Sequence, residues 1–304
     1  MDTADIYGWI WWGIMVMVST FNFMLLAHVL RKYPKAPPQI QPDGEYRIMK
    51  YCAIVFTTVC AYRAVLPRID VTRVCWFDSF LNWTFFGRIA ACFAEIGWAT
   101  QMGLLLRRLA HCERVQFVDS YPMHFEKAGY SVIVLACIAE CCSWTNLITE
   151  SNLFAVFEQF LWMILFEITG IGFILLLHRY STNTLPRSFW IFGIAMIVIG
   201  VEQGVESLGL YLTEYLHDER LHKEYYGFIE GLSRLAQCDT VSHSIDDWLF
   251  DALWMTGYFS VGVWSSHRHR PARPPSLTLL HPISAEVDAA RGAMIDAVQN
   301  VQFF

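Results

Sequence analysis

The feature that most constrains the fold lies in the first thirty residues. Between Asp5 and Arg31 there is no formal charge, so Ile6 to Leu30 form an uncharged stretch. A helix crosses a bilayer with about 20 mainly apolar residues, and this stretch is long enough to cross with some tilt. A cleavable signal peptide has a basic start and a shorter apolar region, whereas this chain begins with Asp2 and Asp5. We therefore expect a retained membrane anchor.

The composition extends this expectation to the whole chain. Of 304 residues 55% are hydrophobic and 16% charged, against about 25% charged in soluble proteins. Residues 1–270 are predicted to form an all-α, polytopic bundle of seven transmembrane helices, and residues 271–304 a cytoplasmic tail that is partly amphipathic or disordered. The predicted spans lie near 6–30, 51–66, 80–106, 128–148, 153–178, 189–216 and 248–266.

The connecting segments predict the orientation of the bundle. With the N-terminus outside, 15 lysines and arginines fall in inner segments and 5 in outer ones. Since cytoplasmic loops carry an excess of Lys and Arg, this alternation favours an outer N-terminus and a cytoplasmic C-terminus. In the longest outer loop, apolar residues recur at helical spacing from Leu221 to Leu235, which predicts an amphipathic helix near 219–236.

Nine ionisable residues fall inside the predicted spans. A charge at the centre of a bilayer costs at least about 2.5–3.5 kcal/mol, so each of them needs a partner or water. Seven lie in the outer half of their spans, and the other two, Glu95 and Glu167, lie deeper. We therefore expect a water-accessible acidic cavity that opens outward; the alternative is a network of structural salt bridges that only fixes the register of the helices. The nine candidates for binding a substrate or ion are Arg63, Arg88, Glu95, Glu140, Glu158, Glu167, Glu202, Glu206 and Asp251.

Helical spacing relates some of these residues to each other. Arg88 and Glu95 are two turns apart, and we expect each to pair with another helix rather than directly. Glu202 and Glu206 are one turn apart on one face, where two ionised carboxylates repel, so a proton or a cation is expected between them. Small residues along 87–97 predict that the third span lies at the centre of the bundle.

The outer loop from Arg63 to Asp78 is rich in charge. It can be an anion-contacting rim, but we favour a tight, salt-bridged turn. Cys75 and Cys238 both lie in outer loops, where a disulfide can form in an oxidising compartment. Asn82 belongs to a glycosylation sequon at the membrane boundary, and we expect the sequon to be unused.

The sequence predicts no cofactor and no metal site. No lysine occupies the interior of a span, which excludes a retinal Schiff base, and the ten histidines do not form the pairs that a bis-histidine haem needs. A net charge of −6 offers no basic surface for nucleic acid. The expected partners are the lipid bilayer of the plasma membrane or an endomembrane and a small molecule or ion, and a homo-oligomer is compatible with the sequence.

Three functions stay open. The first is a transporter or channel for a cation, a proton-coupled solute or a cationic solute, in which Glu95 and Glu167 continue the path inward. The second is an intramembrane enzyme acting on a lipid or apolar substrate, with Glu202 and Glu206, or Glu140 and Asp251, as acid and base. The third is a heptahelical receptor or assembly subunit, which rests on architecture alone. No catalytic residue is assigned.

Overall fold

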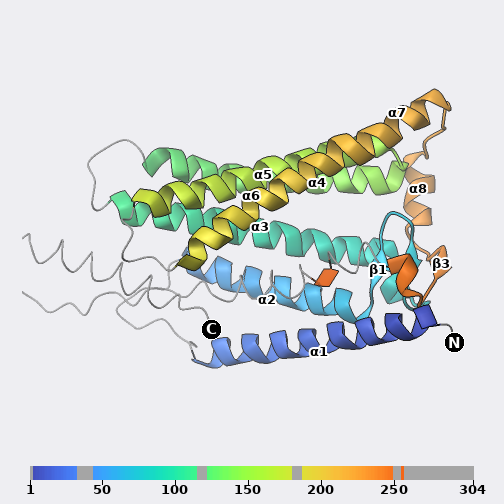
Figure 1. Cartoon of the computed structure of the whole chain (residues 1–304), viewed down its shortest axis with the longest axis horizontal. Helices are drawn as coiled ribbons and strands as arrows, with labels where there is room; N and C mark the ends of the chain where they lie inside the picture. The colour runs from blue at the N-terminus through green and yellow to red at the C-terminus, as the bar shows by residue number, and fades with distance from the viewer. Residues whose placement is uncertain (1–2, 33–43, 115–121, 180–186, 249–254, 257–304) are drawn as a thin grey trace, which may run out of the picture.

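Six long helices run along one axis and form an all-α bundle (Figure 1). The computed structural model describes residues 3–32, 44–114, 122–179, 187–248 and 255–256. Each of the six is long and apolar enough to cross a membrane, so the chain has the architecture of a multi-pass integral membrane protein. The helices are α1 (Thr3–Lys32), α2 (Gly44–Val65), α3 (Thr84–Arg114), α4 (Pro122–Thr149), α5 (Asn152–Arg179) and α6 (Arg187–Val205).

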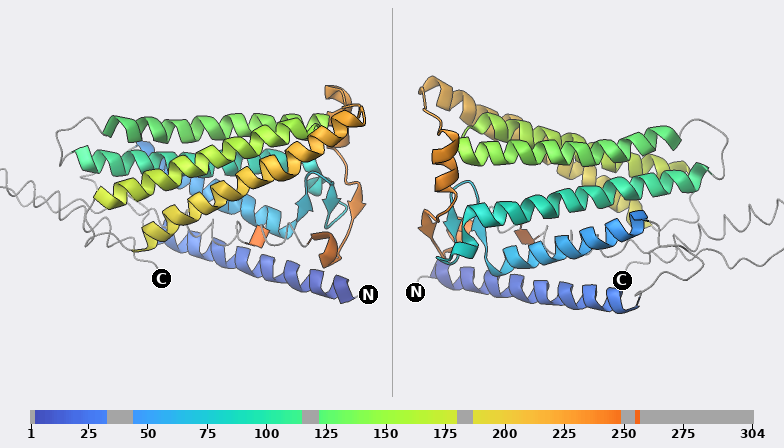
Figure 2. Two further views of the ribbon diagram at one scale, coloured as in Figure 1. Left: turned by 45° about the horizontal axis from the view of Figure 1, so that its top comes forward. Right: turned by 180° about the vertical axis from the view of Figure 1, so that it is seen from behind.

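Helix α6 continues without a break beyond Val205. A π-helical turn, Glu206–Tyr211, joins α6 to α7 (Leu212–Arg220). Together they run obliquely across the bundle and reach the end that carries α8 (Figure 1 and Figure 2). Large apolar side chains cover the outward surfaces of the long helices, among them Met17, Phe93, Val134 and Ile191, as expected for surfaces that face lipid.

The centre of the bundle is formed by α3 and α5. Helix α3 packs on α2, α4 and α5, and α5 packs on α4 and α6, which agrees with the central position predicted for the third span. Glycines allow the backbones of α3 and α4 to approach closely: a Cβ on Gly103 of α3 would lie 2.3 Å from the carbonyl oxygen of Gly129 on α4. Small residues let helix backbones approach in this way within a membrane.

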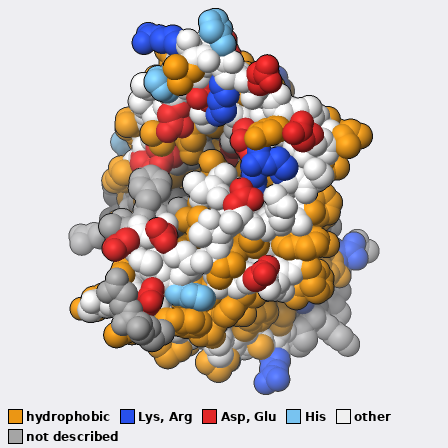
Figure 3. Space-filling model, turned by 90° about the vertical axis from the view of Figure 1, so that its right-hand side faces the viewer, with side chains coloured by type: hydrophobic (Ala, Val, Ile, Leu, Met, Phe, Trp, Pro, Cys, Tyr) orange, Lys and Arg blue, Asp and Glu red, His pale blue; other side chains and the backbone are white. Residues whose placement is uncertain are grey.

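One end of the bundle carries a folded cap, which we define as residues 66–83, 149–151 and 221–248. It contains β1 (Arg68–Ile69), β2 (Val74–Cys75), the 3₁₀ helix Phe80–Asn82, α8 (Phe228–Arg234) and β3 (Thr240–Val241). The strand order is β1-β2-β3, with β1 antiparallel to β2 and β2 parallel to β3. Seen from this end, acidic, basic and histidine side chains are spread over the surface (Figure 3).

The cap also fixes the start of α1. Trp9 and Trp11 of α1 pack against the fully buried ring of Trp76, and Trp9 stacks on His243. Gly8 makes this approach feasible, because a Cβ there would lie 1.9 Å from the His243 carbonyl oxygen. The first turns of α1 are therefore packed against the cap.

The single amphipathic helix predicted near 219–236 is wrong. Helix α7 ends at Arg220, and His222 adopts a left-handed φ of 52°, which ends the helical path. The next helix, α8, is short, and Leu235 directly after it is buried while Phe228 and Ile229 stay exposed. The backbone therefore divides the predicted apolar face between the connecting segment after α7 and helix α8.

The predicted seventh span, 248–266, falls largely outside the described residues. Trp248 is described, at the end of a helical stretch, and so are Met255 and Thr256. Met255 is buried, and Trp11 of α1 donates a hydrogen bond to the Thr256 hydroxyl at 3.2 Å. The predicted tail, 271–304, also lies outside the described residues.

Candidate functional site

The strongest candidate site is a group of buried charges between α3 and α4. One guanidinium nitrogen, Nη2 of Arg88, contacts Glu95 Oε2 at 3.0 Å and Glu140 Oε2 at 2.6 Å. Arg88 is 7% exposed and Glu140 is 2% exposed. Glu158 of α5 is half-buried and lies within electrostatic range of the same arginine. We call Arg88, Glu95, Glu140 and Glu158 the acid cluster.

The expectation that Arg88 and Glu95 do not pair directly is wrong. Residues seven apart lie almost on the same side of a helix, about 10 Å along its axis. A long arginine and a glutamate that extend toward each other bridge this separation, and their contact is 3.0 Å. The part of the expectation that asked for a partner on another helix is met by Glu140 of α4.

The two glutamates that share Arg88 lie at similar depths. Glu95 comes eleven residues after Thr84, the first residue of α3, and Glu140 comes nine residues before Thr149, the last residue of α4. At about 1.5 Å per residue these offsets place both glutamates roughly 14–17 Å from the cap end of the bundle. That depth is well inside the hydrocarbon thickness of about 30 Å.

A second charged group lies directly above, where the cap joins α2 and α3. Asp70 accepts from Arg63 Nη1 at 3.2 Å and from Arg68 Nε at 2.5 Å. Arg68 is fully buried, its Nη1 donates to the Trp83 carbonyl oxygen at 3.0 Å, and its guanidinium lies against Gly87, where no side chain intervenes. Burial alone would raise the pKa of Asp70, but the charges of Arg63 and Arg68 outweigh it and hold that pKa well below its ordinary value.

A third charged group connects three segments of the cap: the loop between β1 and β2, the residues after α4, and the region of α8. Arg73 pairs with Glu150 and, at 2.9 Å, with Asp239, while Arg234 contacts the same two carboxylates at 2.9 and 3.9 Å. Arg73 and Glu150 both adopt left-handed backbone conformations, with φ of 51° and 56°. Such a conformation is uncommon for residues other than glycine, and here it turns both side chains toward the same network. The charged loop from Arg63 to Asp78 is thus a salt-bridged turn, as favoured from the sequence.

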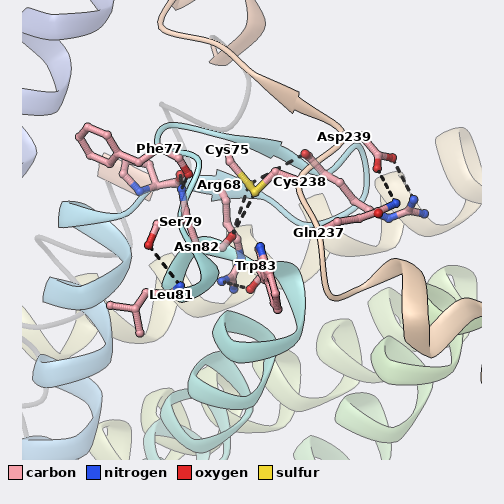
Figure 4. The surroundings of a disulfide bond; sticks show 12 residues. Arg68, Cys75, Phe77, Ser79, Leu81, Asn82, Trp83, Gln237, Cys238 and Asp239 are labelled. Carbon is pink, nitrogen blue, oxygen red and sulfur yellow. Dashed lines mark hydrogen bonds and ion pairs between the residues drawn. A yellow bond between two sulfur atoms is a disulfide. The ribbon is translucent and has the colours of Figure 1, made fainter.

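The disulfide joins this turn to the segment after α8. Cys75 of β2 and Cys238 are bonded, the pairing anticipated from the sequence (Figure 4). Asn82 lies beside them and is fully buried, with its Nδ2 donating to the carbonyl oxygens of Pro67 and Phe77. A side chain held in this way is not available to a glycosylating enzyme, in line with the expectation for the sequon.

The other predicted residues do not line one common site together with the acid cluster. Glu167 is half-buried against Gly200 of α6. Gly200 and Gly204 of α6, together with Ser207 of the π-helical turn, form the face that packs on α5. Glu202 is turned about 200° from Gly200. Glu202 is accordingly exposed, whereas Glu206 is half-buried. The common interior face expected for Glu202 and Glu206 is therefore not formed, and Asp251 lies outside the described residues.

A cavity of about 570 Å³ lies where α7 meets the start of α5. Its walls include His217, Asp218 and Lys223, and none of the nine predicted residues lines it. Asn152 and Lys223 both donate to Asp218, at 3.2 and 2.9 Å. The sequence did not single out this site, because its residues come from two separate segments of ordinary polar composition.

No metal site is found within the described ranges, since no three histidine, cysteine, aspartate or glutamate side chains gather there as ligands. Comparison with protein-family models, curated proteins and solved structures finds no significant match. Inference about function therefore rests on the side chains of this chain alone.

Proposed function

We propose that this chain is a membrane transporter or channel that moves protons, alone or together with a cationic solute. The acid cluster is its proton-binding site. The observation that carries the proposal is the sharing of one nitrogen, Arg88 Nη2, by the carboxylates of Glu95 and Glu140 from two different helices. Both carboxylates therefore lie beside a single positive charge at bilayer depth.

The charges in this cluster do not balance. One guanidinium neutralises one carboxylate, and a second ionised carboxylate next to the first is repelled by it. An unpaired charge away from water is energetically unfavourable, and binding a proton removes that charge. A carboxyl pair that gains and loses one proton, close to a fixed positive charge, is what a proton relay through a bilayer requires.

The finer architecture is part of the proposal: seven spans, an outer N-terminus and a cytoplasmic C-terminus. The distribution of Lys and Arg between alternating segments supports this orientation. The disulfide between Cys75 and Cys238 supports it independently, because disulfides persist in oxidising compartments and the cap would lie on the non-cytoplasmic side. The acid cluster then lies below the outer surface, beneath the cap.

Proton flux into liposomes tests the proposal. The full chain is reconstituted with a trapped pH-sensitive dye, and a potassium gradient with valinomycin drives proton entry. Wild-type protein is expected to acidify the vesicles, and Glu140→Gln and Glu95→Gln to reduce the rate to that of empty vesicles. Glu230→Gln, at an exposed position on α8, is the matched control. Wild-type flux equal to that of empty vesicles, both without solute and with a panel of organic cations added outside, would overturn the proposal.

A structural role for the cluster is separated from a functional one by a second measurement. Glutamine keeps an oxygen that accepts from Arg88 but cannot ionise, so Glu140→Gln is expected to fold with the thermal stability of the wild type in detergent. A folded, stable variant without flux supports the proton site. A folded variant with unchanged flux would show that Glu140 serves only to fix helix packing.

A further inference from the structure

We infer that ordered water binds between the cap and the acid cluster, along the first turns of α3, and connects the two. Its ligands are Arg68, Thr84, Arg88 and Glu140. Only the role of this water as a route for protons rests on the proposed function; the binding of water does not depend on it.

The inference starts from four buried polar atoms. Arg68 Nη2, Thr84 Oγ1, Arg88 Nε and Glu140 Oε1 have no hydrogen-bond partner within the described part of the chain. Arg68 and Thr84 are 0% exposed, so bulk solvent does not reach them. Buried polar side-chain atoms in folded proteins are, in the large majority, bonded to protein or to ordered water. Four such atoms on successive, neighbouring residues indicate a hydrated site.

The four atoms are arranged in order from the cap inward. Arg68 lies against Gly87 and donates from its other nitrogen to Trp83, at the start of α3. Thr84 and Arg88 follow one turn apart on the same face of α3. Arg88 in turn contacts Glu140. A chain of water along this face therefore leads from the cap to the acid pair.

The chemistry of the four atoms selects water as the ligand. Arg68 and Arg88 offer only donors, Glu140 offers an acceptor when ionised, and the Thr84 hydroxyl is both. An anion would be repelled by Glu140, and a metal cation would find only two oxygen ligands, the Thr84 hydroxyl and Glu140 Oε1, which are too few to hold it. Water donates and accepts, so it satisfies every member of the set. Along such a chain each water accepts one proton and passes one on, and one proton arrives at the Glu95–Glu140 pair.

The direct test is an experimental structure of the full chain in lipid nanodiscs, at a resolution that shows ordered water. Peaks are expected about 2.7–3.2 Å from Arg68 Nη2 and Thr84 Oγ1. The inference is overturned if these atoms bond to other protein groups or if the space between them is dry. A peak that disappears when chloride is replaced by gluconate would identify an anion and would overturn it equally.

A pair of variants tests the role of the water in proton movement. Thr84→Val keeps the shape of the side chain and removes the hydroxyl, and it is expected to slow proton flux about tenfold, the effect of losing one hydrogen bond of the route. Thr84→Ser restores the hydroxyl and is expected to restore the flux. Thr169→Val is the matched control, because the Thr169 hydroxyl is buried on α5 and already donates to Leu165.

The outcomes separate this inference from the proposed function. Water peaks together with unchanged flux in Thr84→Val would overturn the route and support the binding site. Absence of flux in the wild type would overturn the proposed function, while the peaks still decide whether water binds. Flux in the wild type with a dry site would overturn only this inference.

Discussion

The cap and the acid cluster differ in the number of arginines that contact each carboxylate. In the cap three carboxylates are each contacted by two arginines: Asp70 by Arg63 and Arg68, and both Glu150 and Asp239 by Arg73 and Arg234. In the acid cluster one arginine is contacted by two carboxylates. An acid between two cations has more than one counter-charge, whereas two acids on one cation must share a single one. The three cap carboxylates are therefore fully paired, and the two carboxylates of the cluster are not.

The largest expected effect comes from removing the shared cation of the cluster. Arg88→Met leaves two carboxylates buried without a counter-charge, and breaking a buried pair in this way costs about 3–5 kcal/mol. The free energy of unfolding, measured by SDS titration in mixed micelles, is expected to fall by this amount. Adding Glu140→Gln to Arg88→Met should recover part of the loss, since one carboxylate is removed.

Arg73→Met in the cap sharpens the same comparison. Arg234 still contacts both Glu150 and Asp239 after this change, so its cost is expected to be smaller than that of Arg88→Met. Equal losses in the two variants would contradict the view that the two regions share their charges differently.

The second largest effect is expected from the covalent link in the cap. The disulfide joins residues 163 positions apart, and removing a disulfide costs about 2–4 kcal/mol. The double variant Cys75→Ser/Cys238→Ser should lose this stability in SDS titration while the acid cluster keeps its contacts. Cys137→Ser, at an exposed free cysteine, is the control and should match the wild type.

A smaller, pH-dependent effect is expected at Asp70. The pKa of Asp70 in the folded protein lies well below the ordinary value. Its ion pairs therefore stabilise the cap above a pH of about 4, and this stabilisation is lost as the pH falls toward the folded pKa. Asp70→Asn should cost about 2 kcal/mol at neutral pH. The difference from the wild type should shrink below pH of about 4 in thermal unfolding scans.

The control for this experiment is Asp246→Asn, at an exposed position in the cap. A gap between wild type and Asp70→Asn that stays constant down to the lowest pH would show that the charge of Asp70 does not stabilise the cap.

The smallest expected effect concerns the cation–π contact of Arg234 with a tyrosine ring. Its guanidinium lies 4.2 Å from the centre of the Tyr226 ring, and a cation–π contact at such a partly exposed site is worth about 0.5–1 kcal/mol. Tyr226→Leu should lose this amount in SDS titration, and Tyr226→Phe, which keeps the ring, should lose less. Equal losses in the two variants would show that the ring face does not contribute.

The long helices of this fold could be predicted from the sequence, because a membrane-spanning helix is encoded in one continuous apolar segment. Six predicted spans correspond to long apolar helices, although α2 begins at Gly44 rather than near residue 51 and α3 begins at Thr84 rather than near 80. The position of Cys75 and Cys238 in loops on one side also followed from counting spans, without any knowledge of their separation.

The details of the site were less accessible, because they depend on side-chain reach and helix rotation. The direct contact between Arg88 and Glu95 requires two extended rotamers, which spacing alone does not give. The exposure of Glu202 follows from which face of α6 meets α5, and this is fixed by Gly200 and Gly204. The buried position of Arg68 depends on the absent side chain of Gly87, a contact between two segments.

The bond between Cys75 and Cys238 also determines how the chain behaves when it is cut. One break in the backbone anywhere between residues 76 and 237 produces two fragments that remain attached to each other. On a gel without reducing agent such a nicked molecule migrates as one species, and with reducing agent it separates into two. Limited proteolysis therefore locates accessible connections from either side of the membrane without dispersing the protein.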